Sequence, residues 1–434
     1  MCAEFLHSAS VLRINPKRTV LRPYFFTSKV MGQAQSHITR AQHICQYILG
    51  LSFDECHLRL TELSQGFISG HPHARKYFLE RFEDVKKLVG PYFGGMDDIE
   101  DPHAALIGAY FCREYAFEAA AVMNPSIVTH PDQTGLVDGA TRFCLSVRCV
   151  GEGHLSTLAF RSVLILEDGT IELEPEPPFA VEACPLAHAT AGPVTLVRPD
   201  GLSLFATVIF PITSSQAMGI EDLRLVEFTQ ENGETVYLGT YTAYSGSETT
   251  TELFETTDFQ TIQLTPLQGA ASAYKGLALF PRRINGYYAA IGRLDLENLH
   301  YLETKDPRVW NYGQTLLSPR HGWELVQIGT CGPPIELDEG WLLLIYGVGA
   351  MRRYGLGAVL LDKSDPRKVL ARSKAPLLAP QADTREGYVP NVIHSCGSIR
   401  HKDRVIIPYA VAESSIRFVS VTISSLLADL RGGQ

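Results

Sequence analysis

The chain has 434 residues and a formal net charge of -9 at pH 7, and 45% of its residues are hydrophobic. This length allows one large domain with an addition, and the apolar fraction permits a sizeable core. The acidic balance argues against nucleic acid or an anionic membrane as the main partner, so we expect a neutral or weakly charged substrate.

Helical periodicity is confined to the first part of the chain. Residues 41–49 and 74–88 place apolar side chains at helical spacing with charges on the opposite face, and Ala, Leu and Glu dominate 103–121. The sequence therefore predicts three helices. We interpret 35–122 as a helical insertion that walls one side of a substrate cleft, makes an oligomer contact, or only covers apolar surface.

Five later segments carry mostly alternating apolar residues and end in small or polar clusters, which is typical of strands. They are 141–148, 236–244, 286–293, 341–349 and 404–412. The later ones recur at roughly the spacing of a propeller blade, with turn signals between them, which favours five blades over a two-sheet sandwich. In a propeller, inner strands bring distant residues to one channel, so Asp222, Arg293 and Tyr346 are expected to be neighbours.

Two adjacent carboxylates, Glu221 and Asp222, stand beside Arg224. Because successive side chains on a strand point to opposite faces, we expect only one of them to face a given cleft. A carboxylic acid in a cleft near a cation can donate a proton to a leaving oxygen. The alternative interpretation is a turn whose acids are solvated.

The sequence gives no sign of a metal site, a disulfide framework or a membrane segment. Its nine cysteines include no Cys-x-x-Cys pair, and His71, His73 and His103 lack regular ligand spacing. No apolar run is long enough to span a bilayer, and the N-terminus lacks the hydrophobic stretch of a signal peptide. We therefore expect a cytoplasmic protein without a metal.

Residues 219–224 resemble the Gly-x-Glu-Asp-x-Arg signature of glycoside hydrolase family 130, five-bladed propeller enzymes that cleave β-mannosides by phosphorolysis or hydrolysis. The similarity continues in family order through 274–293, 328–335, 340–342, 357–366 and 387–392. The resemblance implies an all-β five-bladed β-propeller with an N-terminal α-helical insertion. Residues 1–34 would supply a strand that completes the propeller, 35–122 the insertion, and 123–434 the catalytic propeller.

The resemblance also assigns roles at the reaction centre. It makes Asp222 the proton donor, acting on the glycosidic oxygen through a sugar hydroxyl, with Glu221 and Arg224 as supporting residues. Arg293 and Lys275 stand where two phosphate-binding arginines are expected, and a lysine offers only a point charge. Two further positions depart from the family pattern. Gln327 replaces a phosphate lysine, and Tyr346 replaces a histidine.

These losses of positive charge favour water over phosphate, so the preferred prediction is an inverting hydrolase of manno-oligosaccharides. Such an enzyme needs a second carboxylate to activate water, and Glu324 is the candidate base. The alternative for Glu324 is a surface acid beside a core tryptophan. Other functions stay open: a phosphorylase that releases mannose 1-phosphate, a related mannosyltransferase, or a sugar-binding propeller without catalysis.

The remaining predicted contacts concern the sugar. Asn124 and Arg148 are expected to bind it, together with Tyr346 and with Glu413, which occupies the place of a mannosyl-binding aspartate. No cofactor is predicted, and inorganic phosphate is the one co-substrate considered. The expected partner is a β-mannoside oligosaccharide, and a homo-oligomer stays open.

Overall fold

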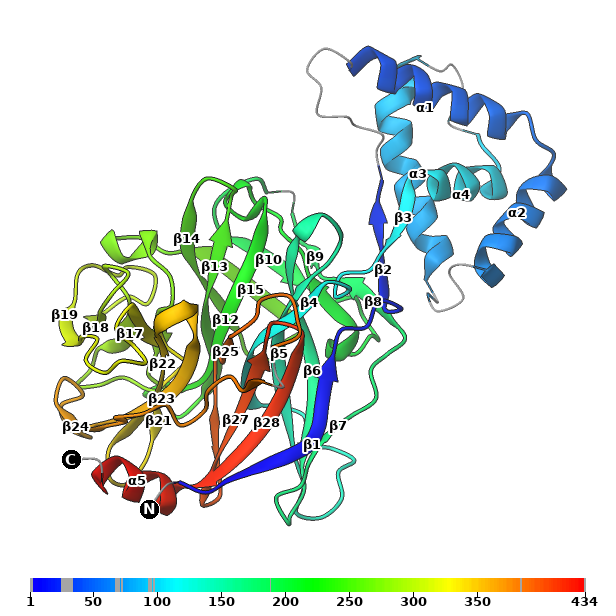
Figure 1. Ribbon diagram of the computed structural model, residues 1–434. Helices are drawn as coiled ribbons and strands as arrows, with labels where there is room; N and C mark the ends of the chain where they lie inside the picture. The colour runs from blue at the N-terminus through cyan, green and yellow to red at the C-terminus, as the bar shows by residue number, and fades with distance from the viewer. Residues whose placement is uncertain are drawn as a thin grey trace. The chain divides into compact units, whose positions relative to one another are not determined.

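The computed structural model describes residues 3–24, 34–66, 71, 73–92, 96, 98–187, 189–382 and 385–432. The chain divides into two compact units. One unit comprises 17–116 and 178–181 and carries four helices within its described residues. The other comprises 1–16, 117–177 and 182–434, and strands dominate it (Figure 1).

The smaller unit is built around helix α3 (Ala74–Val89), which buries Phe78, Phe82 and Val85 at spacings of four and three residues. Helix α4 (Asp101–Tyr110) approaches α3 so closely that a β-carbon at Gly108 would lie 1.8 Å from the Phe78 carbonyl oxygen. The unit is completed by α1 (Ala34–Leu49), α2 (Phe53–Gly66), β2 (Thr19–Pro23) and β3 (Cys112–Tyr115).

The predicted helical segments 41–49 and 74–88 lie within α1 and α3, whereas α2 was not predicted. The third predicted helix is wrong beyond Tyr110. There the chain turns into β3, which pairs antiparallel with β2 from Val20↔Tyr115 to Pro23↔Cys112. Strand pairing with a distant segment outweighs the helical propensity of these residues.

Three sheets of the larger unit consist of antiparallel strands that are consecutive in sequence, except that the third also contains β1. The first contains β16 (Ala278–Leu279), β17 (Tyr288–Gly292), β18 (Leu299–Thr304) and β19 (Gln314–Leu317). The second contains β20 (Gln327–Thr330), β21 (Ile335–Glu336), β22 (Trp341–Val348), β23 (Tyr354–Leu361) and β24 (Val369–Arg372). The third contains β25 (Ile393–His394), β26 (Ile399–His401), β27 (Arg404–Val411), β28 (Ser415–Thr422) and β1 (Phe5–Arg13).

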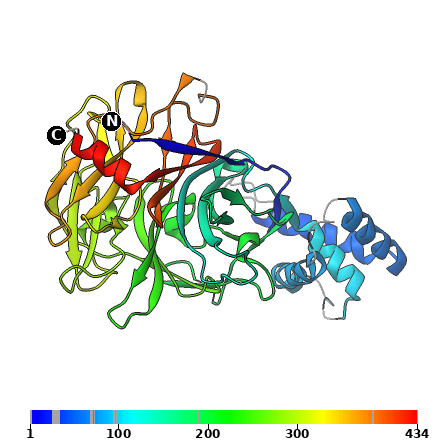
Figure 2. The same ribbon diagram turned by 90° about the horizontal axis from the view of Figure 1, so that it is seen from below.

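The pairing of β1 with β28 joins the two ends of the larger unit. Figures 1 and 2 show these two strands side by side, and their register runs from Phe5↔Val421 to Arg13↔Ser415. Helix α5 (Ile423–Gly432) follows β28 and buries Leu426, Leu427 and Leu430.

The fourth sheet contains two groups of antiparallel strands. One group comprises β12 (Gly219–Thr229), β13 (Thr235–Tyr244), β14 (Thr249–Thr256), β15 (Thr261–Pro266), β10 (Val194–Val197) and β9 (Cys184–Pro185). The other comprises β4 (Ala121–Thr129), β5 (Thr141–Val150), β6 (Ser156–Ile165), β7 (Ile171–Leu173) and β11 (Thr207–Ile209). Strand β8 (Phe179–Glu182) pairs in parallel with β2. A single parallel pair, Gly219↔Ser156, joins the groups.

All five predicted strands are present, and they fall within β5, β13, β17, β22 and β27 with small differences at their ends. Every residue of β22 is buried, because neighbouring sheets cover it. Phe280, for example, meets Trp341 edge to face at 5.0 Å between two sheets. The mostly β fold with few helices is thus as expected, whereas the five-bladed closure remains a prediction.

Candidate active site

Strand β12 is irregular at the Glu221–Asp222 doublet. Its pairing with β13 shifts register between Glu221 and Arg224, and Asp222 has a φ of 58°. This bulge inserts one extra residue, so the two side chains do not alternate as they would on a regular strand. Both carboxylates reach Arg148, whereas only Asp222 lines the small cavity beside the doublet, as expected.

Arg148 of β5 holds the two carboxylates together. Its Nη2 lies 2.7 Å from Glu221 Oε1, and its Nη1 lies 3.3 Å from Asp222 Oδ1. A third contact, from Nε to Ser156 Oγ at 2.7 Å, fixes the guanidinium plane. Arg148 thus contacts the acids of the doublet directly.

Asn124 reaches the same carboxylate from β4. It also sits in a bulge, with a φ of 51° and a register shift between Met123 and Ser126. Its Nδ2 donates a hydrogen bond to Asp222 Oδ1 at 2.5 Å. Two bulges on adjacent groups of strands therefore aim Asn124 and Asp222 at each other.

A small cavity of about 40 Å³ opens beside Asp222. Its nine lining residues come from segments far apart in sequence: Asp222, Arg224, Lys275, Gly276, Arg293, Gly329, Thr330, Tyr346 and His394. The structure therefore brings together Asp222, Arg293 and Tyr346, as the sequence predicted. Asp222 is the one carboxylate in this lining.

Three cationic side chains face this cavity. Arg224 is 4% exposed, and its Nη1 donates to the Asp222 carbonyl oxygen at 2.9 Å. Arg293 is 7% exposed, and no carboxylate of the described residues lies within 4.0 Å of its guanidinium. The Lys275 side chain is 41% exposed, and its Nζ lies 3.9 Å from Glu221 Oε2. The cavity thus carries an excess of positive charge.

His394, at the end of β25, was not identified from the sequence. Its ring lies 4.9 Å from that of Tyr346, and its Nδ1 is buried without a hydrogen-bond partner among the described residues. Burial, with the charges of Arg224 and Arg293, lowers the pKa of His394 to about 4, although Asp222 opposes this. The available signal was its position two residues after the matched stretch 387–392.

Tyr346 and Gln327 form a neutral pair at the positions where the resemblance expected basic residues. Gln327 Nε2 donates to Tyr346 Oη at 2.9 Å, and the tyrosine ring stacks on Tyr354 at 5.5 Å. Gln327 does not line the cavity.

The two carboxylates of the doublet titrate differently. Burial acts to raise the pKa of Asp222, but the charges of Arg148 and Arg224 outweigh it and hold the pKa below its ordinary value. Burial raises the pKa of Glu221. The charge of Arg148 opposes this increase, and the charge of Asp222 adds to it. In the absence of a ligand, Asp222 is therefore ionised at neutral pH.

Glu413 belongs to the same electrostatic cluster. It follows Ala412 in a turn after β27, where both residues have positive φ values of 53° and 49°. Burial raises the pKa of Glu413, and Asp222 adds to this while Arg148 opposes it. Its charge therefore interacts with the doublet.

Glu324, the predicted base, lies away from the cavity beside Asp222. It is fully buried, accepts hydrogen bonds from the backbone N–H groups of Arg320 and His321, and lies 2.8 Å from Arg372 Nη2. It is not among the residues that line the cavity. These contacts hold the turn before β20, and the burial of Glu324 contradicts the alternative of a surface acid.

Comparison with known proteins defines the class. Residues 203–431 match the family model of glycoside hydrolase family 130, described as beta-1,4-mannooligosaccharide phosphorylase. The chain therefore belongs to glycoside hydrolase family 130. This membership agrees with the resemblance of the motif that begins at Gly219.

Two curated relatives are phosphorylases. The chain is 33% identical over 231 residues to beta-1,2-mannobiose phosphorylase of Listeria innocua. This match covers 51% of the chain and 63% of that protein. The chain is also 38% identical over 144 residues to 1,2-beta-oligomannan phosphorylase of Thermoanaerobacter sp.. This match covers 33% of the chain and 48% of that protein. The chain thus spans less than two thirds of each relative's length.

A solved structure has a similar fold. Beta-1,2-mannobiose phosphorylase from Listeria innocua, in complex with beta-1,2-mannobiose, superimposes with a TM-score of 0.53 at 22% identity. The match covers 72% of this chain and 92% of that chain.

The preferred prediction of hydrolysis assumed that Tyr346 and Gln327 leave the site short of positive charge. In the structure, Arg224 and His394 line the same cavity as Lys275 and Arg293.

The described part of the chain contains no group of three or more His, Cys, Asp or Glu side chains suited to a metal ion. None of its helices has the length and apolar character needed to cross a bilayer.

Proposed function

We propose that the protein is a β-mannoside phosphorylase that uses inorganic phosphate and releases α-mannose 1-phosphate. The observation that carries this proposal is the cavity beside Asp222, where Arg224, Lys275, Arg293 and His394 converge. Basic side chains gathered in a partly enclosed space are suited to a phosphate dianion. The names of the curated relatives support the same reaction.

The size of the cavity supports a small anion in it. A volume of about 40 Å³ holds about three water molecules, at 10–15 Å³ each. A sugar ring therefore lies outside it, on the side of Glu221, Arg148 and Asn124. The phosphate then approaches the anomeric carbon from the cavity.

Phosphorolysis needs a nucleophile and a proton at opposite sides of the scissile bond. A phosphate oxygen attacks the anomeric carbon, the bond from that carbon to the glycosidic oxygen breaks, and the leaving oxygen takes a proton from Asp222. The family resemblance implies that the proton passes through a sugar hydroxyl. One displacement inverts the configuration, so a β-mannoside gives the α-phosphate.

Phosphate binding also explains how Asp222 can act as an acid. In the free site, Arg148 and Arg224 hold its pKa below the ordinary value. A dianion beside Arg224, Lys275 and Arg293 offsets those charges and raises the pKa of Asp222, because like charges disfavour ionisation. The proton donor is thus formed when the nucleophile is bound.

The sugar-binding roles remain part of the proposal. Asn124 and Arg148 contact the doublet, and the charge of Glu413 interacts with it, so all three are suited to hold mannosyl hydroxyls around Asp222. Tyr346 lines the anion cavity, so we assign it to that side. Glu324 has no part in this mechanism.

The architecture we propose is a five-bladed propeller of 123–434 closed by the N-terminal strand, with 35–122 as an insertion. A second cavity of about 340 Å³ supports it. Five segments line that cavity: 127–129, 225–229, 281–282, 333–336 and 398–400. Each follows, within a few residues, a segment that lines the first cavity or contacts Asp222. Five strands along one channel would produce this pattern.

The test is incubation with β-1,2- and β-1,4-mannobiose, with and without inorganic phosphate. We expect mannose 1-phosphate and mannose in equal amounts, formed only when phosphate is present. Mannose formed at the same rate without phosphate would contradict the proposal and support hydrolysis. Absence of turnover with both disaccharides would favour a sugar-binding propeller.

A further inference from the structure

We infer that His394 supplies the imidazole of the phosphate site, in place of the histidine that the family resemblance expects at position 346. This inference rests on the proposed function and names a further binding residue for it. The imidazole would reach the anion from β25 instead of β22.

Tyr346 offers a phenol in place of that imidazole. Its hydroxyl accepts a hydrogen bond from Gln327, and its ring is stacked on Tyr354. The phenol is kept neutral, since burial raises its pKa. Tyr346 therefore lines the cavity as a neutral hydroxyl held by Gln327, and the imidazole must come from another residue.

His394 has the opposite properties. Its ring lines the cavity and packs against Tyr346 at 4.9 Å. Neither ring nitrogen forms a hydrogen bond with another described residue, and Nδ1 is buried. Buried polar groups rarely remain without a partner, so each such group calls for an explanation. An anion held by Arg224 and Arg293 would supply the missing acceptor.

The protonation state suits this role. The charged groups around the ring are Asp222, Arg224, Arg293 and Lys275, and burial with the three cations keeps it neutral in the free site. A neutral imidazole donates one hydrogen bond without adding a further charge to the cluster of cations.

The experiment compares His394→Phe, which keeps a ring without nitrogen atoms, with the double variant His394→Phe/Tyr346→His, which returns an imidazole from β22. We expect the single variant to raise the KM for phosphate about 10-fold, equivalent to about 1.4 kcal/mol, with the KM for the mannobioside changed less than about twofold. The double variant should recover most of the loss. An unchanged phosphate KM in the single variant would overturn the inference.

Two controls keep this result interpretable. His394→Gln retains a hydrogen-bond donor, so its KM for phosphate should lie between those of wild type and His394→Phe. If His394→Phe does not fold, a wild-type KM for phosphate in His394→Gln overturns the inference. Phosphate binding measured by calorimetry is the second readout. If wild type makes no mannose 1-phosphate, the proposed function fails, yet phosphate binding that depends on His394 would still support this assignment.

A separate cavity points to a second ligand site. We propose that a groove of about 690 Å³ at the far end of β4 and β5 binds a neutral saccharide. The groove begins at His130 and Arg142, each six residues from a residue that contacts Asp222. At about 3.3 Å per residue, it lies roughly 20 Å from the doublet. The two cavities share no residue.

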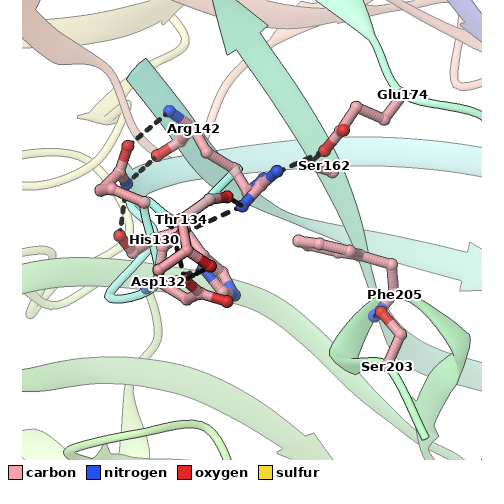
Figure 3. A network of polar contacts seen from close by, with 9 residues as sticks. His130, Asp132, Thr134, Arg142, Ser162, Glu174, Ser203 and Phe205 are labelled. Carbon is pink, nitrogen blue, oxygen red and sulfur yellow. Dashed lines mark hydrogen bonds and ion pairs between the residues drawn. The ribbon is translucent and has the colours of Figure 1, made fainter. Parts of the chain in front are cut away.

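The groove combines aromatic rings with fixed polar groups. Figure 3 shows several of these side chains with the polar contacts between them. The rings of His130 and Phe205 lie 5.4 Å apart at 43°, and burial lowers the pKa of His130, so its ring is neutral. Arg142 Nε lies 3.1 Å from Glu174 Oε2, and its Nη1 donates to the carbonyls of Asp132 and Thr134. These contacts hold the groove in shape before a ligand binds.

Three of the polar side chains in the groove keep one atom available. Arg142 Nη2, Asp132 Oδ2 and Glu174 Oε1 make no hydrogen bond with the rest of the described chain, whose contacts use the other atoms of these side chains. Two cations, Arg142 and Arg198, face three acids, Asp132, Glu174 and Asp258, so the charges nearly cancel. Spare donors and acceptors beside an aromatic face, with little net charge, suit hydroxyl groups on a neutral ring.

The test uses the Asp222→Asn protein with excess β-mannobiose to fill the active site, in gels that contain neutral mannan. We expect mannan to retard this protein, Phe205→Ala to reduce the retardation at least fivefold, and Phe205→Trp to keep it. Equal retardation of the Phe205→Ala protein would overturn the proposal, as would retardation by an anionic polysaccharide alone. The readout does not require turnover, so it is independent of the proposed reaction.

Discussion

Arg148 is the residue whose removal tests the electrostatics of the site most sharply. It contacts Glu221 at 2.7 Å and Asp222 at 3.3 Å, and the exposed fractions of the three side chains are 14% to 19%. Arg148→Met would leave two largely buried carboxylates without their nearest cation. Removing one partner of a buried pair costs about 3–5 kcal/mol, and the partial exposure here places the expected loss near 3 kcal/mol.

The sign of the pH dependence follows from the pKa of Asp222, which is lowered in the folded protein. Its ionisation stabilises the fold fully above the ordinary pKa of about 3.9. This contribution is lost as the pH falls from there toward the lowered pKa of the folded protein. Without Arg148, the contribution shrinks. The difference in unfolding free energy between wild type and Arg148→Met should therefore be largest near pH 7 and narrow as the pH falls below about 4.

The assay is urea unfolding followed by tryptophan fluorescence. Trp310, Trp323 and Trp341 all lie in the larger unit, so the signal reports the unit that carries the site. The matched control is Arg282→Met. Arg282 forms a two-pronged pair with Glu336 at 2.8 Å but is 41% exposed, so we expect a loss below about 1 kcal/mol. Equal losses in the two variants, or a gap that does not narrow with acid, would refute the reasoning.

Three further predictions follow. Asp222→Asn should lower kcat about 10³-fold with an unchanged circular dichroism spectrum, and an unchanged rate would remove it as the proton donor. Lys275→Ala should raise the KM for phosphate about tenfold and that for the mannoside less than about twofold, because its Nζ lies beside the anion cavity; equal increases would contradict that role. Glu324→Gln should lower the unfolding free energy by about 3 kcal/mol through its contact with Arg372 and leave kcat within about threefold. A large loss of kcat with full stability would restore Glu324 as a base.

Much of the site could be predicted because its residues lie in contiguous motifs. Asp222, Lys275 and Arg293 belong to the matched stretches, and the structure brings all three to one cavity. The strands were predictable for a similar reason, since alternation of apolar residues is a local property. The blade closure and the domain boundaries are not tested by these patterns and stay predictions.

The rest depends on contacts between distant segments. The bulges at Asn124 and Asp222 place non-glycine residues at positive φ, which local sequence does not signal and which surrounding contacts enforce. His394 became a site residue only because β25 lies beside Tyr346. The burial and the pairing of Glu324 could not be read locally, because its partner Arg372 is 48 residues away.

The reverse reaction tests the central proposal most directly. A phosphorylase catalyses its reaction in both directions, whereas a hydrolase does not use a sugar phosphate as a donor. With α-mannose 1-phosphate as donor and mannose as acceptor, we predict release of inorganic phosphate that depends on the acceptor and equals the β-mannoside formed. The proposal would be contradicted if a preparation that splits β-mannobiose in phosphate-free buffer releases no phosphate from α-mannose 1-phosphate.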